Sequence, residues 1–152
     1  MPSRHFRAGV VAVITRSDDD ILAFERADVP GSWQLPQGGI EPGEEALDAV
    51  WREVNEETGL GPDDVTLVGE HPDWVPYEWP PDVRAGRKGI GQVQRWFTFR
   101  VVDEAVVPRP DGSEFTAWRW VDRQWLIDNV PPFREPAYRR VLDVHGWGDI
   151  QP

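Results

Sequence analysis

Three glutamates near the middle of the chain have a spacing that could bind a metal ion. On a helix, where each residue turns by about 100°, Glu53, Glu56 and Glu57 fall on one side, next to the apolar face. Like charges at these spacings destabilise a helix, and anions are unfavourable near its C-terminus. A divalent cation would offset both effects, and magnesium prefers carboxylate oxygens. The spacing alone leaves two interpretations open, a metal site or a solvated acidic face.

The helix that carries these glutamates is predicted to begin at about Glu44 and to end at Gly59. Its apolar residues recur at i, i+3, i+4 and i+7, which predicts one buried face. These residues are Leu47, Val50, Trp51 and Val54. Gly59 is predicted to be a left-handed cap, with Leu60 as its hydrophobic contact. The carboxylates would therefore lie beside the core and not opposite it.

The remaining pattern predicts one α/β domain over residues 1–152, with a mixed sheet and helices packed on it. Apolar, β-branched runs predict strands at 9–14, 21–24, 33–35, 65–68, 93–102 and 115–121, the first two as a hairpin. Segment 71–88 has no regular period and is predicted to be a long surface loop. Asp122 is predicted to cap a helix through Ile127, and a last helix runs over about 135–144.

The composition of the 152-residue chain excludes several classes of protein. Its formal net charge of −11 argues against a protein that coats nucleic acid, and no DNA partner is expected. A small phosphorylated ligand is compatible with that charge, because bound divalent cations reverse the local potential. The chain has no cysteine, which excludes disulfides and thiolate zinc sites. No membrane partner is expected, and the absence of a secretory pattern predicts a cytoplasmic location.

A wider motif surrounds the three glutamates. From Gly38 the sequence reads Gly, five residues, Glu44, seven residues, and then Arg-Glu-Val-Asn-Glu-Glu-Thr-Gly-Leu over 52–60. This pattern, over residues 38–60, resembles the Nudix box at every defined position. The resemblance implies the Nudix fold, an α/β/α sandwich around a mixed β-sheet in a single domain. It also implies hydrolysis of a nucleoside diphosphate linked to another group, with Mg²⁺ as cofactor and Mn²⁺ as a substitute.

The resemblance also gives roles to residues. Glu53, Glu56 and Glu57 would bind the metal, and Arg52 and Glu44 would hold the loop and helix in position. Glu114 matches a carboxylate outside the box that approaches the metal as a ligand or general base; a simple loop carboxylate is the competing interpretation. The residues implied to be catalytic are Glu53, Glu57, Glu114 and Arg52, and those implied to be structural are Gly39, Glu44 and Gly59.

The flanking sequence resembles one branch of the family. Trp-Gln-Leu-Pro-Gln-Gly-Gly-Ile at 33–40 and Gly-Gln-Val-Gln-Arg-Trp-Phe at 91–97 are similar to the RNA pyrophosphohydrolases and dinucleoside polyphosphate hydrolases. Phe133 would stack on a base or pack in the core, and Arg26, Arg84, Arg87 and Lys88 could reach distal phosphates or be solvated. The implied substrate-binding residues are Arg7, Arg26, Ser32, Gln37, Gly38, Tyr77, Gln92, Gln94, Phe133 and Arg134.

The substrate is expected to be a nucleoside polyphosphate, and diadenosine tetraphosphate or a related dinucleoside polyphosphate is favoured. The segment after Tyr77 is acidic, with Glu78 and Asp82, where relatives that act on RNA are often basic. Removal of pyrophosphate from 5′-triphosphorylated RNA, held by its 5′ end alone, is the second hypothesis. Less favoured are a nucleoside triphosphate pyrophosphatase, a non-catalytic nucleotide-binding module and an RNA-binding regulator.

Overall fold

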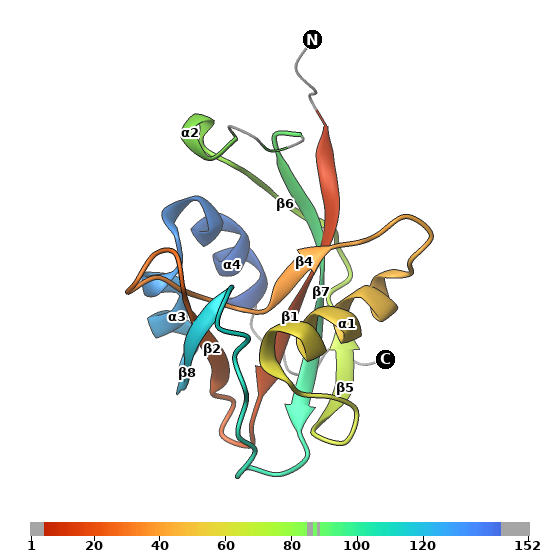
Figure 1. Cartoon of the computed structure of the whole chain (residues 1–152), viewed down its shortest axis with the longest axis vertical. Helices are drawn as coiled ribbons and strands as arrows, with labels where there is room; N and C mark the ends of the chain where they lie inside the picture. The colour runs from red at the N-terminus through yellow and green to blue at the C-terminus, as the bar shows by residue number, and fades with distance from the viewer. Residues whose placement is uncertain (1–4, 85–86, 88, 144–152) are drawn as a thin grey trace.

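A computed structural model describes residues 5–84, 87 and 89–143 (Figure 1). The strands are β1 (Phe6–Thr15), β2 (Ile21–Arg26), β3 (Trp33–Gln34), β4 (Gln37–Gly39), β5 (Val65–Glu70), β6 (Val75–Glu78), β7 (Gly91–Val101) and β8 (Phe115–Val121). The helices are α1 (Ala46–Thr58), α2 (Pro81–Arg84), α3 (Arg123–Asn129) and α4 (Glu135–Leu142), with a 3₁₀ turn, η1 (Pro132–Arg134).

The strands of the described part of the chain form one mixed sheet. The main order is β3-β2-β1-β7-β5, while β4 pairs with β1, β6 with β7 and β8 with β2. The long central strands β1 and β7 are parallel, and the other pairings are antiparallel. Most residues of both central strands are buried, because the strands are covered on both faces, as is typical of parallel strands. The predicted mixed sheet is confirmed.

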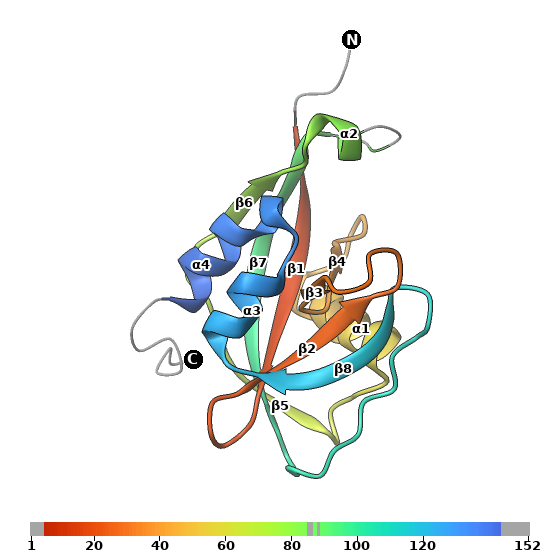
Figure 2. The ribbon, with the colours of Figure 1, turned by 90° about the vertical axis from the view of Figure 1, so that its left-hand side faces the viewer.

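The helices cover opposite faces of this sheet. Helix α1 packs on one face, and α3 and α4 pack on the other (Figures 1 and 2). Alternate residues of β1 serve the two cores: Val10 and Ala12 face α1, whereas Val11 and Val13 face α3 and α4, as the two-residue period of a strand requires. The predicted α/β/α sandwich is therefore confirmed. None of the described helices is long and apolar enough to cross a membrane.

Two expectations about local structure are wrong. Segment 71–88 is not simply a loop, because β6 pairs along β7 and α2 follows it, and Tyr77 and Trp79 are buried. Leu47 does not join the buried face of α1; it is 40% exposed, and Ala49 lies in the core instead. Lys88 lies outside the described residues.

The predicted helix caps and the predicted hairpin are confirmed. Gly59 adopts a left-handed conformation (φ 73°) and its N–H donates to the Asn55 carbonyl, which ends α1. The Asp122 side chain accepts a hydrogen bond from the Trp125 N–H at 2.8 Å and so caps α3. β1 and β2 form the hairpin.

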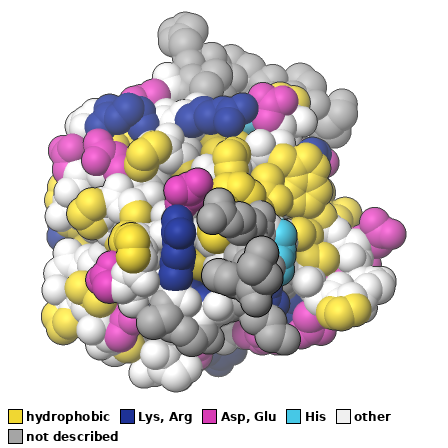
Figure 3. All heavy atoms as spheres, turned by 90° about the horizontal axis from the view of Figure 1, so that it is seen from above, with side chains coloured by type: hydrophobic (Ala, Val, Ile, Leu, Met, Phe, Trp, Pro, Cys, Tyr) yellow, Lys and Arg dark blue, Asp and Glu magenta, His cyan; other side chains and the backbone are white. Residues whose placement is uncertain are grey.

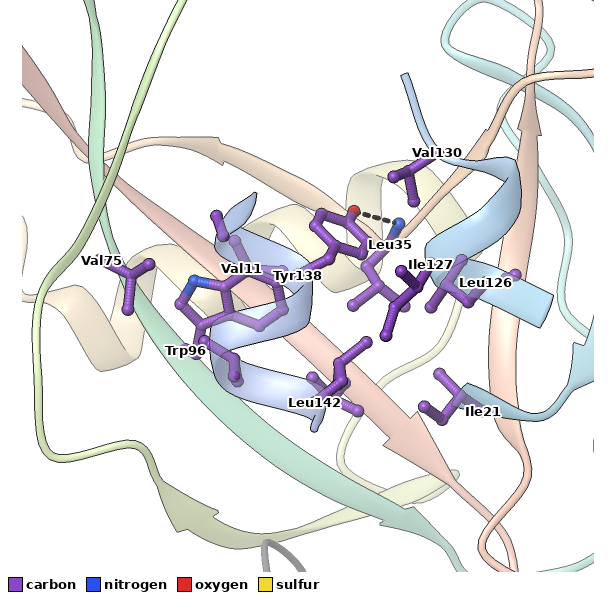
Figure 4. Packing of buried hydrophobic residues seen from close by; sticks show 14 of the residues in the cluster. Val11, Ile21, Leu35, Val75, Trp96, Leu126, Ile127, Val130, Tyr138 and Leu142 are labelled. Atoms are coloured by element: carbon purple, nitrogen blue, oxygen red, sulfur yellow. Dashed lines mark hydrogen bonds between the residues drawn. The ribbon is translucent and has the colours of Figure 1, made fainter. Parts of the chain in front are cut away.

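One buried tyrosine ties α4 to the segment between β3 and β4. The Tyr138 hydroxyl oxygen accepts a hydrogen bond from the Leu35 N–H at 2.9 Å, inside the core between α4 and the sheet (Figure 4). The Tyr138 ring also packs edge-on against Trp96, with ring centroids 5.1 Å apart. Burial raises the pKa of the Tyr138 hydroxyl to about 12, so this group stays neutral. Helix α4 thus fixes the backbone immediately before Gln37.

Replacing Tyr138 with Phe leaves the buried Leu35 N–H without its acceptor. We expect the free energy of unfolding to fall by about 1–3 kcal/mol, the typical effect of an unsatisfied buried donor. Urea denaturation followed by tryptophan fluorescence measures this change. Thr116→Val, at an exposed position of β8, is the control and should change stability little. Equal stability of Tyr138→Phe and wild type would contradict this role.

Candidate active site

Arg52 organises the start of the site from within α1. Its guanidinium donates to both carboxylate oxygens of Glu44, at 2.8 and 2.9 Å, and to the Gly39 carbonyl at 2.9 Å. It also contacts Glu53 at 2.6 Å and Glu56 at 3.5 Å. The hydrogen bonds from Arg52 and from the Glu41 N–H lower the pKa of the Glu44 carboxyl to about 2. Arg52 and Glu44 therefore join the loop before α1 to the helix.

Gly38 and Glu53 approach each other so closely that no side chain would fit between them. A Cβ at position 38 would lie 2.1–2.5 Å from the Glu53 carboxylate atoms. β4 can thus pass directly over the carboxylate, whose side chain is only 13% exposed. Burial raises the pKa of Glu53, and the nearby charges of Glu56 and Glu114 add to this effect, while Arg52 acts in the opposite direction.

Glu57 is the most buried of the three box glutamates. It is 4% exposed, and its Oε1 accepts a hydrogen bond from the Gln37 N–H at 2.9 Å. Burial, and then the charge of Glu53, raise the pKa of the Glu57 carboxyl to about 9. The Gln37 amide opposes this rise only in part. Two acidic groups are therefore held together in a place where negative charge is unfavourable.

The other two acidic residues are more exposed. Glu56 has a side chain that is 55% exposed. Glu114 is exposed just before β8, yet its charge contributes to the raised pKa values of Glu53 and Glu57, so it faces the same region. Within the described ranges, no three acidic or histidine side chains are already close enough to form a complete metal site. The donor chemistry nevertheless fits a hard divalent cation, because every side chain offered is a carboxylate.

A polar cluster lies on the opposite side of β4 from these carboxylates. The Gln37 Oε1 accepts hydrogen bonds from Arg134 Nη1 at 2.6 Å and from Gln94 Nε2 at 3.2 Å. Gln94 Nε2 also donates to Gln92 Oε1 at 2.9 Å. Gln94 is 1% exposed and Arg134 is 6% exposed, so both are interior side chains. Gln37 belongs to both groups, through its backbone to Glu57 and through its side chain to this cluster.

Aromatic rings enclose the buried guanidinium of Arg134. Its carbon atom lies 4.8 Å from the Tyr77 ring centroid and 5.1 Å from that of Phe133. The Tyr77 and Phe133 rings are themselves 5.9 Å apart. Tyr77, Phe133, Phe6 and Pro76 line a largely apolar hollow of about 360 Å³. At this end of the molecule, hydrophobic side chains adjoin positively charged ones on the surface (Figure 3).

Three more of the expected substrate residues lie on or beside β1 and β2. Arg7 is exposed and lies in register with Gln92 on β7. Arg26 is paired with Asp28 at 2.7 Å and donates to Gln34. Ser32 is half-buried, and its carbonyl accepts a hydrogen bond from the Arg26 N–H at 2.9 Å.

The arginines expected to reach distal phosphates are occupied elsewhere. Arg84 donates to the Trp79 carbonyl and lies near Glu78. Arg87 donates to the Val83 carbonyl and stacks on Trp79. Both guanidinium groups therefore stabilise the segment around α2.

Two residues that shape the site carry no motif in the sequence. Gly9, on β1, leaves room for Gln92, since a Cβ there would lie 2.6 Å from Gln92 Oε1. A glycine inside an otherwise apolar strand is a recognised signal of such a close approach and could have identified it. Tyr138 has no comparable signal, because its contact with Leu35 joins residues 103 positions apart.

Comparison with known proteins identifies the family. A family model described as NUDIX domain matches residues 5–142. The chain belongs to the Nudix family. This Nudix chain is 36% identical to an RNA pyrophosphohydrolase of Rhodospirillum rubrum, covering 97% of the chain and 92% of the relative. It is 38% identical to an RNA pyrophosphohydrolase of Cereibacter sphaeroides (90% and 88%) and 35% identical to the chloroplastic Nudix hydrolase 26 of Arabidopsis thaliana (94% and 70%).

Solved structures show the same Nudix fold. The E. coli dihydroneopterin triphosphate pyrophosphohydrolase superposes with a TM-score of 0.73 at 22% identity, over 92% of this chain and 99% of the other. An Ap4A hydrolase of C. elegans gives a TM-score of 0.68 at 18% identity, over 88% and 93%. The predicted fold, branch and hydrolase class are thus confirmed. Nudix hydrolases generally use divalent metal ions.

The close approach of Gly38 to Glu53 makes a sharp prediction. Gly38→Ala would push the Glu53 carboxylate or β4 away, so we expect pyrophosphohydrolase activity to fall at least about 10-fold, in the range seen when residues that support a functional side chain are changed. Gly39→Ala is the matched control, because a Cβ there meets only the Ala8 carbonyl at 3.9 Å. Steady-state kinetics of both variants measures the difference. Equal losses in the two variants would contradict the steric argument.

The raised pKa of Glu57 predicts how stability varies with pH in the metal-free protein. The pKa is about 9 when folded, against an ordinary value of 4.5. The folded state therefore holds this proton more tightly, and the resulting stability is complete below about pH 4.5 and is lost as pH rises towards 9. Glu57→Gln has no such proton, so its stability should fall less between about pH 6 and pH 9.

Urea denaturation in the presence of EDTA at several pH values tests this prediction. The quantity to compare is the change in unfolding free energy with pH for wild type and for Glu57→Gln. Parallel curves for the two proteins would show that Glu57 carries no raised pKa. Adding a divalent cation to wild type should restore stability at the higher pH.

Proposed function

We propose that this protein is a Mg²⁺-dependent pyrophosphohydrolase that cleaves nucleoside polyphosphates, with Mn²⁺ as a substitute cofactor. The main observation behind this proposal is the buried pair Glu53 and Glu57, which lie together despite their mutual repulsion. Glu53 lies directly under Gly38 of β4, and Glu57 accepts a hydrogen bond from the Gln37 N–H. Such an arrangement is unfavourable for a structural helix but suits a cation site. Glu56 and Glu114 would complete the set of carboxylate ligands.

The chain's own residues divide the work. Bound metal ions would supply charge neutralisation of the phosphates, alignment of a water and stabilisation of the leaving phosphate. Arg52 keeps Glu53 and the loop at Gly39 in place through its hydrogen bonds. Glu53, Glu57 or Glu114 would accept the proton of the attacking water. Phe133 and Tyr77 would bind a base, next to Arg7 and Ser32. Arg26 and Arg134 would supply positive charge to the phosphates.

We propose a dinucleoside polyphosphate, diadenosine tetraphosphate in the first place, as the substrate. The net charge of −11 and the acidic residues Glu78 and Asp82 disfavour contact with a long polyanion. The similarity of the fold to an Ap4A hydrolase is compatible with this choice. Hydrolysis would give two nucleotides.

The cytoplasmic location also remains a prediction.

A second candidate is supported by the relatives. Several proteins 36–38% identical to this chain over most of its length are named RNA pyrophosphohydrolases. The corresponding reaction would release pyrophosphate from 5′-triphosphorylated RNA. In this protein the 5′ end alone would be bound, because residues 78–82, directly after Tyr77, contain two acidic residues and no basic one.

Activity should depend on Glu53 and on a divalent cation. We expect wild type with Mg²⁺ to hydrolyse at least one member of a panel of nucleotide polyphosphates, and EDTA to abolish the reaction. Glu53→Gln should lower kcat by at least about 100-fold, as is typical when a positioned carboxylate is lost. Glu104→Gln, an exposed position in the turn after β7, is the control. If wild type turns over nothing in the panel, the hydrolase proposal fails.

Product analysis separates the two candidate substrates. Chromatography after incubation with diadenosine tetraphosphate and, separately, with 5′-triphosphorylated RNA gives the two values of kcat/KM. The proposal expects the dinucleotide to be the better substrate, with a weak salt dependence for both. Equal or greater kcat/KM on the RNA would overturn the preference in favour of the second candidate.

A further inference from the structure

The hydrogen-bonded cluster around Gln94 has only one consistent set of donors and acceptors. An arginine can only donate, so the Gln37 atom 2.6 Å from Arg134 Nη1 must be the amide oxygen. Gln94 approaches that same oxygen at 3.2 Å and must therefore present its NH₂ group. This NH₂ group also lies 2.9 Å from Gln92, which must in turn present its oxygen. The buried charge of Arg134 thereby fixes the orientation of three amides in sequence.

The consequence appears at the open ends of the cluster. Gln37 and Gln92 are partly exposed, and both have their oxygens turned inward to Gln94. Their NH₂ groups are then left as the outward-facing polar atoms. Arg134 Nε is buried with no hydrogen-bond partner among the described groups, so it lies inside the cluster and not at its edge. The cluster therefore offers donors at its edge, while its amide oxygens are already engaged.

The surroundings favour an anionic, oxygen-rich ligand. The partner of the Arg134 guanidinium is the neutral Gln37 amide and two aromatic rings enclose it, although the protein as a whole is strongly acidic. Arg7 lies in register with Gln92 and adds a second cation near the same end of β7. The backbone N–H of Gln37 meets Glu57, so this donor edge adjoins the carboxylates proposed to bind metal. Phosphate oxygens accept hydrogen bonds from such donors, which matches this edge.

We propose that Gln94 is a positioning residue for substrate recognition. It is too buried to touch a ligand, and it acts by keeping the Gln92 amide turned, as Arg134 does for Gln37, so that the two outward NH₂ groups bind phosphate oxygens of the polyphosphate chain. Gly9 supports the same arrangement, since any side chain there would displace the Gln92 amide. The inference rests on the proposed function for the identity of the ligand. It adds a residue that favours ligands with hydrogen-bond acceptors, although this residue does not contact the ligand itself.

Gln94→Met tests this role, because methionine has a similar length and neither donates nor accepts strongly. Without the Gln94 NH₂ group, the Gln92 amide is free to turn, while Arg134 still holds the Gln37 oxygen. We expect KM for diadenosine tetraphosphate to rise about 3- to 10-fold, the effect of one neutral hydrogen bond, with kcat within about 2-fold of wild type. The Kd of a methylene-bridged analogue, measured by calorimetry with Mg²⁺, should rise by the same factor.

Gln94→Glu provides the opposite chemistry at the same position. A carboxylate accepts hydrogen bonds, so Gln92 would turn its NH₂ group inward and present its oxygen to the phosphates, whereas Arg134 keeps the Gln37 oxygen in place. The rise in KM and Kd should exceed that of Gln94→Met. Gln124→Met and Gln124→Glu, at an exposed position of α3, are the matched controls and should leave both constants unchanged. Thermal unfolding of every variant shows whether the fold is retained.

Three outcomes would overturn the inference. In the first, Gln94→Met binds the analogue as tightly as wild type. In the second, the kcat of Gln94→Met falls while its KM stays unchanged, which would mean that the cluster supports the carboxylates and not substrate binding. In the third, wild type itself does not bind the analogue. Failure of wild type to hydrolyse any polyphosphate would instead contradict the proposed function, and the Kd comparison would still decide the role of Gln94.

Discussion

The carboxylate of Glu57 is buried, which is unfavourable for a charged group, and the surrounding residues offset this cost only in part. The Gln37 N–H donates to it, and Gly38 lets β4 pass over the neighbouring Glu53. Arg52 supplies positive charge to Glu53, but it is shared with Glu44 and the Gly39 carbonyl. Negative charge is thus left only partly compensated at one end of α1. Electrostatic imbalance of this kind is typical of functional sites, where the missing charge arrives with a ligand.

The short strand β4 is the boundary between two kinds of chemistry. On the α1 side it faces carboxylates, and on the α4 side its Gln37 side chain meets buried donors and Arg134. The separation follows from the alternation of side chains along a strand, which sends neighbouring residues to opposite faces. Negatively and positively charged side chains therefore lie on opposite sides of β4, where they do not pair directly with each other. A polyphosphate carrying metal ions needs both environments at once.

Much of this site could be predicted from the sequence because it is local. Gly38, Glu44, Arg52 and the three glutamates lie within one short motif, and helix geometry relates most of them. The Gly59 cap and the strands with clear apolar patterns are predictable for the same reason. Where prediction failed, the deciding contacts are distant in sequence. β6 exists because it pairs along β7, and its segment, rich in proline and tryptophan, shows no period of its own. Burial of polar residues is equally hidden: Gln94 lies between Gln92 and Arg95 in a polar part of its strand, yet it is 1% exposed and hydrogen-bonded to Gln37 and Gln92.

The position of α4 in the chain has a consequence for biosynthesis. Arg134 and Tyr138, which hold Gln37 and the backbone before it, are made long after the Nudix motif, which is complete at Leu60. Until α4 has emerged from the ribosome and docked, β4 lacks two of its supports. Domains generally fold as whole units during synthesis. A nascent chain that already contains every residue of the motif should therefore stay inactive until translation has passed α4.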